Sequence, residues 1–398
     1  MLHALAISAV LIVVSACSSG PSQAEIDLEK PIAADLAKIR NEPLVGGARY
    51  EVPGAQAGLA LEGSEPVEVS DGHVDVAKTA EVGDDSVFFV GSVTKTFTSA
   101  LVLKLAQDDK LSLDDPISKY VEYPNGDKIT VKDCLAQESG IPDFETLPDY
   151  KQLVQEGASP EQVVAGVAEL NRSNFAPGQG WGYSNTNYLI AGIAAQKAGG
   201  DDWAQQIEDN FIGPLGLDST SILDPVEGKN LVQGYGICDG TDGAGCTDGL
   251  KPIDTKAPKL YWAAGAIVSN GSDLATWIRA LASGKVLDAE HTKLMLTPTA
   301  QSAAGVAAWR DNRDHVIKAD GLGMFEFELD GVKAYGHDGL IAGTRAIAVY
   351  APDATAGKAG GDATPAAQAL LLNVDAAQVQ SGLVMLTKTV RAEVTADN

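Results

Sequence analysis

The sequence predicts an α/β domain that carries a large, mainly helical insert. Strand-like runs occur at residues 56–61 and 86–90 and return in the last third of the chain. Helical patterns dominate the region between about 110 and 300. Strands at both ends, with helices between them, indicate one split layer, to which both ends of the chain contribute strands.

The composition is that of a globular protein with an acidic surface. Of the 398 residues, 45% are apolar and 21% are charged, and the formal net charge is −25 at pH 7. This charge argues against nucleic acid or an anionic membrane face as an electrostatic partner. The length allows one large domain or two small ones.

The N-terminus has the features of an export signal. Residues 1–16 are interpreted as a signal peptide, because the apolar run is too short to span a membrane comfortably. The small residues before Cys17 resemble the lipobox of bacterial lipoproteins, which predicts lipidation of Cys17 and anchoring to the bacterial cell membrane. The alternative is secretion without lipidation, in which Cys17 lies in the removed signal peptide or in a frayed N-terminus. Residues 17–47 are interpreted as a tether with a docking helix at 32–39, followed by the main domain over 48–398.

The first motif begins an apolar helix that we expect to run to about Ala106. Ser92 is predicted to be the N-cap, a position that serine favours. Lys95 follows on the same face among apolar residues, so its amine must be paired or lose its charge. A hydroxyl beside a desolvated amine is a nucleophile beside a base. A capping serine and a lysine that lies along apolar surface would show the same spacing.

The middle of the chain is predicted to be mainly helical. Asp115-Pro116 is a helix-start signal, since proline suits the first helical position. Thr130 is predicted to cap the next helix. The expected helices cover residues 129–137, 160–170, 187–198 and 201–211.

The second motif is Tyr183-Ser184-Asn185, which follows a Pro-Gly turn. A phenol near a lysine can relay a proton, and the amide of Asn185 can hold a substrate carbonyl or bridge to the lysine. Tyr183 alone is also typical of an aromatic residue that packs a loop.

The cysteines suggest a structural use. Cys238 and Cys246 flank a loop rich in glycine and aspartate and could close a short disulfide. Cys134 lies in an apolar helical run and is predicted to be a buried thiol. The loop has the wrong spacing for a calcium site, and we expect no metal.

The last third is predicted to be rich in strands and to end in a helix over 376–393. The strand-like runs cover residues 322–329, 332–335, 344–350 and 367–373.

The third motif, His337-Asp338-Gly339-Leu340, follows one of these strands. The basic side chain of His337 could line one wall of a cleft, and Gly339 would let a substrate backbone approach. The amide of Leu340 could donate to an oxyanion. A turn histidine is the simpler explanation of His337 taken alone.

Together the three motifs resemble the serine beta-lactamase and penicillin-binding protein family. They stand in the family's order and approximate spacing, in the branch whose second and third motifs are Y-x-N and H-x-G. That branch includes D-alanyl-D-alanine carboxypeptidases, class C beta-lactamases, D-aminopeptidases and related esterases. Similar blocks extend over most of residues 50–395. The resemblance therefore implies the beta-lactamase/transpeptidase-like α/β fold, in which an antiparallel sheet is flanked by helices and carries a large, mainly helical insert. It also implies a serine hydrolase that works through an acyl-enzyme.

The resemblance also implies a role for each motif residue. Lys95, together with Tyr183, would take the proton from Ser92, which would attack a substrate carbonyl. The backbone amides of Ser92 and Leu340 would hold the oxyanion, and Tyr183 would pass a proton to the leaving group. Water would then release the acyl group, without a metal or cofactor. The predicted substrate-binding residues are Asn185, His337, Gly339 and Leu340.

The sequence leaves the substrate open. Carboxypeptidases and beta-lactamases usually carry a hydroxyl residue where this chain has Asp338. A carboxylate facing the cleft would repel a substrate carboxylate and could receive an ammonium, unless it points away. Arg345 on the following strand could offset it. We expect a monomeric hydrolase, similar to D,D-carboxypeptidases and beta-lactamases, for peptide, amide or ester substrates of the cell envelope, without potent beta-lactam hydrolysis.

Two other functions explain part of the sequence. The first is a penicillin- or cell-wall-binding lipoprotein with little or no turnover, which would give burst kinetics alone. A site that has lost its turnover need not keep Ser92, Lys95 and Tyr183, and this chain keeps all three. A solute-binding lipoprotein of unrelated fold would explain Cys17 and the acidity but none of the three motifs.

Overall fold

The structure is a computed structural model that describes residues 28–41, 51–238, 246, 249–309, 315–354, 365–375 and 378–396. The predicted signal peptide and Cys17 lie outside these residues. Within the described ranges, none of the helices combines the length and the apolar character that a membrane crossing requires.

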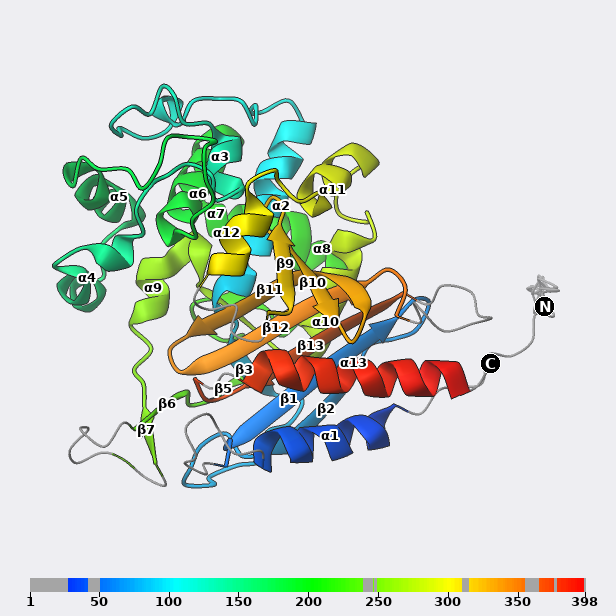
Figure 1. The fold of residues 1–398 in the computed structure, drawn as a ribbon. Coiled ribbons are helices and arrows are strands. Elements are labelled where there is room, and N and C mark those ends of the chain that lie inside the picture. The colour runs from blue at the N-terminus through cyan, green and yellow to red at the C-terminus, as the bar shows by residue number, and fades with distance from the viewer. Residues whose placement is uncertain are drawn as a thin grey trace, which may run out of the picture.

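A seven-stranded antiparallel sheet forms the centre of the domain (Figure 1). Its strand order is β2-β1-β13-β12-β11-β10-β9. The two ends of the chain meet where β1 pairs with β13, from Ala55↔Leu372 to Leu61↔Ala366. The predicted split layer is therefore confirmed. The strands are β1 (Gly54–Leu61), β2 (Val67–Gly72), β9 (Ile317–Asp320), β10 (Phe325–Leu329), β11 (Val332–Ile341), β12 (Thr344–Ala351) and β13 (Ala366–Leu372).

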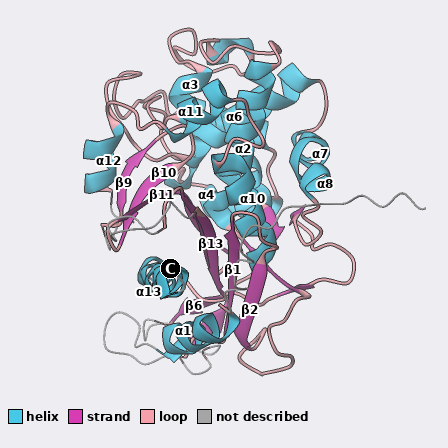
Figure 2. Ribbon diagram, turned by 90° about the vertical axis from the view of Figure 1, so that its right-hand side faces the viewer, coloured by secondary structure: helices cyan, strands magenta, loops and turns pink. Residues whose placement is uncertain are grey.

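Helices cover both faces of this sheet (Figure 2). Helices α1 (Glu29–Asn41) and α13 (Gln378–Ala396) pack against one face, and α10 (Gly271–Ala282) packs against β1, β12 and β13 on the other. Successive residues of β13 serve the two layers, because side chains alternate along a strand. Helix α1 contains the docking helix predicted at 32–39 and packs against the sheet.

The region between the sheet strands is mainly helical, as predicted. Helix α2 packs against α6 in its centre, and the Phe97 ring of α2 stacks on Trp277 of α10 at 3.8 Å between centroids. The helices of this region are α2 (Thr94–Gln107), α3 (Val131–Leu135), α4 (Tyr150–Glu156), α5 (Pro160–Glu169), α6 (Asn185–Gly199), α7 (Trp203–Ile207), α8 (Gly213–Leu215), α9 (Ala257–Tyr261), α11 (Ala289–Leu296) and α12 (Ser302–Ala308).

Short strands accompany these helices and were not all predicted. A second sheet has the order β4-β8-β3-β5, and β6 pairs with β7. These strands are β3 (Ser86–Phe89), β4 (Ser221–Ile222), β5 (Asn230–Leu231), β6 (Tyr235–Ile237), β7 (Leu250–Pro252) and β8 (Ile267–Ser269). Apart from β3, they have three residues or fewer, which is too short for an alternating pattern to emerge.

Two predicted element boundaries are wrong. The start signal at Asp115-Pro116 leads only to a 3₁₀ turn over Ile117–Lys119, because Pro116 is extended and forms a β-bridge with Thr130. The strand predicted to end at Tyr335 continues to Ile341, so the third motif lies inside β11 and pairs with β12. By contrast, Thr130 caps α3 as predicted, with Asp133 completing a capping box.

The structure gives the cysteines the two uses that the sequence suggests. A disulfide joins Cys238 to Cys246. Cys134 is a free, fully buried thiol, and burial raises its pKa far above the ordinary value. A buried, protonated thiol is a poor nucleophile, so Cys134 serves packing.

Candidate active site

Ser92 lies in a tight turn that joins the small sheet to α2. The turn is a 3₁₀ helix over Gly91–Val93 (η1), and α2 itself begins at Thr94. The prediction that Ser92 is an N-cap is wrong, because the N-cap residues are Val90 for η1 and Val93 for α2. That hydroxyl is bonded to the Lys95 side chain instead. Gly91 has a φ of 52°, and a Cβ there would lie 2.7 Å from the backbone nitrogen of Leu340.

Lys95 is fully buried and has three polar contacts. Its Nζ lies 2.9 Å from Ser92 Oγ, 2.7 Å from Asn185 Oδ1 and 2.8 Å from the carbonyl oxygen of Ala264. An unprotonated amine has two N–H groups and one lone pair. The two carbonyl oxygens of Asn185 and Ala264 accept the two N–H groups, which leaves the lone pair for the Ser92 hydroxyl.

The electrostatics of Lys95 support that state. Burial lowers its pKa to about 7, although nearby carboxylates, first among them Asp143 and Glu145, act in the opposite direction. A substantial fraction of the amine is therefore unprotonated near neutral pH. An amine of this pKa is well matched to general-base catalysis at neutral pH.

Asn185 is held by a pair of carboxylates that the sequence analysis missed. Its Nδ2 donates to Asp143 Oδ2 at 3.0 Å and to Glu145 Oε1 at 3.2 Å, so its Oδ1 has to face Lys95. Burial raises the pKa of Asp143 to about 6. Asp143 and Glu145 follow a Ser-Gly-Ile-Pro break at 139–142, and nothing in their spacing to the three motifs marks them for the site.

The ring of Tyr183 lies beside the amine of Lys95. Its ring centroid lies 4.9 Å from Lys95 Nζ, and its ring stacks on Trp309 at 4.8 Å between centroids. Desolvation raises the pKa of the phenol far above its usual value, and a hydrogen bond with Ser92 acts in the other direction. The phenol therefore keeps its proton at neutral pH. The lowered pKa of Lys95 and the raised pKa of Tyr183 favour Lys95 as the proton acceptor and Tyr183 as a donor.

His337 lies in the site, but its side chain is not the positively charged group that the sequence predicted for one wall of the cleft. The side chain is buried, and desolvation lowers its pKa to about 3, so the imidazole is neutral. Nδ1 contacts the carbonyl oxygen of Asp338, which can only accept, so Nδ1 carries the hydrogen. Nε2 is left as a hydrogen-bond acceptor. The ring lies 4.4 Å from Phe325 and 6.3 Å from Tyr183 between centroids.

Gly339 is required by the protein's own backbone. A Cβ at this position would lie 2.0 Å from the carbonyl oxygen of Val90 and 2.8 Å from the backbone nitrogen of Ser92. The space on this side of Gly339 is therefore filled by the backbone of Val90 and Ser92. Pairing of β11 with β10 ends at Gly336, so residues 337–341 have β12 on one side and an edge without β10 on the other.

Asp338 points away from Ser92. It follows His337 and precedes Gly339 in a strand, so its side chain takes the opposite face of the sheet. There it is buried and accepts a hydrogen bond from Gln380 Nε2 of α13 at 3.2 Å. Arg345 forms an ion pair with Asp375, with 3.4 Å between Nε and Oδ1. The carboxylate of Asp338 is thus not in position to meet a substrate at close range.

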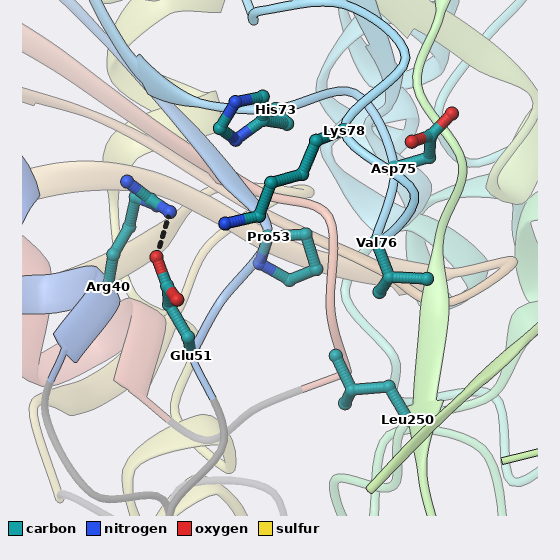
Figure 3. Close-up of a pocket in the computed structure, with 8 residues that line it drawn as sticks. All are labelled: Arg40, Glu51, Pro53, His73, Asp75, Val76, Lys78 and Leu250. Carbon is teal, nitrogen blue, oxygen red and sulfur yellow. Dashed lines mark hydrogen bonds and ion pairs between the residues drawn. The ribbon is translucent and has the colours of Figure 1, made fainter. Parts of the chain in front are cut away.

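A separate cavity of about 130 Å³ opens near the start of β1 (Figure 3). Arg40 lines it and donates to Glu51 Oε1 and Asp71 Oδ2, both at 2.7 Å. Figure 3 shows the Lys78 side chain reaching toward Arg40 and Pro53. None of the three motifs contributes to this lining, so the cavity is not part of the candidate active site.

Sequence comparison relates the chain to beta-lactamases. The family model described as Beta-lactamase matches residues 33–397. Protein flp of Staphylococcus aureus (strain MW2) is 27% identical over 237 residues, 57% of this chain and 45% of the relative. The putative penicillin-binding protein PbpX of Bacillus subtilis (strain 168) is 26% identical over 224 residues, 55% and 52% of the two chains. The chain thus spans about half the length of these curated relatives.

Solved structures of two amide-cleaving enzymes are similar over nearly their whole length. A D-stereospecific amidohydrolase from a Streptomyces species has a TM-score of 0.68 and 26% identity, covering 89% of this chain and 97% of its own. The D-amino acid amidase from Ochrobactrum anthropi SV3 has a TM-score of 0.76 and 22% identity, covering 92% and 100%. At that lower identity the second likeness concerns the fold alone.

Proposed function

Since the chain belongs to the beta-lactamase family of serine hydrolases, we propose that it cleaves amide or peptide bonds of D-amino-acid derivatives through an acyl-enzyme on Ser92. One observation carries the proposal: a fully buried Lys95 Nζ lies 2.9 Å from Ser92 Oγ, and its other two contacts are acceptors. Peptides, amides and esters of the cell envelope are the wider class in which these substrates fall.

The proposed reaction begins with proton transfer from Ser92 to Lys95. The Ser92 oxygen attacks the substrate carbonyl, and the backbone amides of Ser92 and Leu340 hold the resulting oxyanion. Tyr183 gives a proton to the leaving amine and recovers one from Lys95. Water then attacks the ester on Ser92 while Lys95 takes its proton; the bond from Ser92 Oγ to the acyl carbon breaks, and Lys95 returns the proton to Ser92.

The charges around Ser92 favour a substrate that carries an ammonium group. Asp143 and Glu145 lie behind Asn185, and Glu145 is exposed. Asp338, which could have repelled a carboxylate, faces α13 instead. The similarity to the D-stereospecific amidohydrolase supports the same choice. We therefore propose D-aminoacyl amides with a free amino group as the preferred substrates.

A panel of four substrates, assayed on one preparation, tests the proposal. The panel is nitrocefin, a D-Ala-D-Ala peptide, a D-amino-acid amide and a short-chain p-nitrophenyl ester. We expect the D-amino-acid amide to turn over fastest, with the Ser92→Ala protein as the blank for contaminating hydrolases. Faster turnover of nitrocefin or of the D-Ala-D-Ala peptide would contradict the substrate choice. A single burst with no turnover on any substrate would instead support a penicillin- or cell-wall-binding role.

The Glu145→Gln substitution should separate recognition of the ammonium from chemistry. Loss of the carboxylate should raise KM for a D-amino-acid amide about tenfold, because a charge-assisted contact is lost. KM for the N-acetylated amide should stay unchanged. Glu169→Gln, which removes an equal charge from an exposed position on α5, is the control. Equal KM changes for the free and the acetylated amide would refute an ammonium site at Glu145.

We also propose that the chain is exported and anchored through lipid on Cys17. Only the sequence pattern before Cys17 supports this. Growth with an alkyne-tagged fatty acid should label the wild-type protein, and Cys17→Ala should remove the label and release the protein from membranes. An unlabelled wild-type protein in the medium would indicate plain secretion.

A further inference from the structure

The loop that carries Tyr183 is held by residues that the proposed reaction does not use. The carbonyl oxygen of Gln137 accepts from Gly182 N at 2.9 Å, and Gln137 Oε1 accepts from Ser184 N at 3.0 Å. The carbonyl oxygen of Glu138 accepts from Gly178 N at 2.9 Å. These bonds fix the backbone on both sides of Tyr183. They leave open what fixes the direction of its ring.

One aromatic side chain of the same loop is bonded to the sheet. Trp181 Nε1 donates to Asp320 Oδ2 at 3.1 Å. Asp320 is the last residue of β9, the edge strand of the large sheet, and is only 2% exposed. Its Oδ1 has no hydrogen-bond partner among the described residues. A carboxyl group buried in this way is retained at a cost, and besides the backbone of Gly321 its hydrogen-bond partner is Trp181, so this side-chain contact requires an explanation.

The free-energy cost of burying the Asp320 carboxyl group is reflected in its pKa. Desolvation raises its pKa far above the ordinary value, and the nearby carboxyl group of Glu138 acts in the same direction. The bond from Trp181 and the charge of Lys95 act against this rise. A neutral carboxyl group still has a carbonyl oxygen that can accept from the indole.

Aromatic contacts connect Trp181 to Tyr183. The Trp181 ring lies 6.4 Å from the Tyr183 ring and 6.0 Å, edge-on, from the Trp309 ring. Trp309 in turn stacks on Tyr183 with 20° between the planes. On the side of α12, a Cβ at Gly305 would lie 2.7 Å from Trp181, so the indole has no room to shift that way.

We infer that Asp320 is a positioning residue, which fixes Trp181 through a hydrogen bond and thereby holds the Tyr183 phenol beside Ser92 and Lys95. Asp320 does not touch the reacting atoms. Its effect passes through the indole and the three-ring cluster formed by Trp181, Trp309 and Tyr183. The inference rests on the proposed role of Tyr183 in proton transfer.

Release of p-nitroaniline from a D-amino-acid p-nitroanilide, followed in a single turnover with enzyme in excess, measures the step concerned, because it follows acylation of Ser92 and the leaving amine takes the proton that Tyr183 supplies. Trp181→Phe keeps most of the ring but removes the donor, and Asp320→Leu removes the acceptor. Each should lower the acylation rate constant about tenfold with KM within about twofold, and the double variant should lose no more than either single one. Asp320→Asn keeps an acceptor and should stay within about twofold of the wild type.

Trp203→Phe is the matched control, because Trp203 is buried and its Nε1 has no hydrogen-bond partner among the described residues. It should leave the acylation rate unchanged. Additive losses in the double variant, or normal acylation of Trp181→Phe, would overturn the inference while the wild type is still acylated. A wild type that is not acylated would overturn the proposed function instead. If Asp320→Leu does not fold, Trp181→Phe and Asp320→Asn still decide the outcome.

Discussion

Replacing Lys95 with methionine should slow acylation of Ser92 by about 10³-fold and leave the protein folded. Methionine has a similar length and no charge, so it suits a fully buried position on α2. The variant lacks the lone pair that faces the Ser92 hydroxyl. The measurement is the burst rate constant with p-nitrophenyl acetate, together with the melting temperature.

The melting temperature should also change its dependence on pH. In the folded wild type Lys95 loses its proton near pH 7, whereas an unfolded lysine does so near pH 10.5. Between these values the unfolded chain binds more protons, so wild-type stability rises with pH. The methionine variant lacks this contribution, and its melting temperature relative to the wild type should fall from pH 7 to pH 10.

A control on the same helix separates the catalytic effect from a general one. Lys104→Met alters a partly exposed residue of α2 that pairs with Asp108, and it should leave acylation unchanged. Normal acylation of the Lys95→Met protein would show that another group accepts the Ser92 proton, and the proposed reaction would then be wrong.

Gly339→Ala should reduce both stability and acylation, although it adds a single methyl group. The new Cβ would lie 2.0 Å from the Val90 carbonyl oxygen and 2.8 Å from Ser92 N. Strand β11 cannot retreat easily, since it is paired with β12 from Tyr335 to Ile341. Overpacking of this kind costs about 1–3 kcal/mol. Displacement of the Ser92 amide should cost a further factor of about 10² in acylation, because that amide is a proposed oxyanion donor.

Gly166→Ala is the control for Gly339→Ala. Gly166 lies within α5, where a Cβ would meet Leu147 at 3.5 Å, an ordinary contact. The substitution should stabilise the helix by up to about 1 kcal/mol, because glycine is a poor helix former. Calorimetry gives the stability of both variants. If Gly339→Ala melted and acylated like the wild type, the close approach of β11 to η1 would have no functional consequence.

The sequence predicted the fold and the residues that meet around Ser92 because each lies in a short motif. Lys95 is separated from Ser92 by one helical turn, so their contact follows from local geometry. The split sheet followed from strand patterns at the two ends of the chain. His337 was placed in the site but given the wrong charge state, since burial and the proximity of Lys95 are properties of the folded protein.

Other parts of the site depend on contacts that no local pattern records. Asp143 and Glu145 reach Asn185 from a turn that follows an ordinary helix break. Asp320 meets Trp181 across 139 positions of sequence. The direction of Asp338 depends on the register of β11, which extended further than its apolar run indicated. In each case tertiary packing decides what a residue does.

The meeting of Ser92 with Gly339 and Leu340 also sets when activity can arise during synthesis. Ser92 leaves the ribosome early, whereas β11, β12 and β13 come last, and β1 can pair with β13 only after these strands are made. Contacts this distant in sequence form late, since the intervening chain must first be ordered. A nascent chain in which Ser92 and Lys95 are already made therefore lacks the complete site until the final strands have formed.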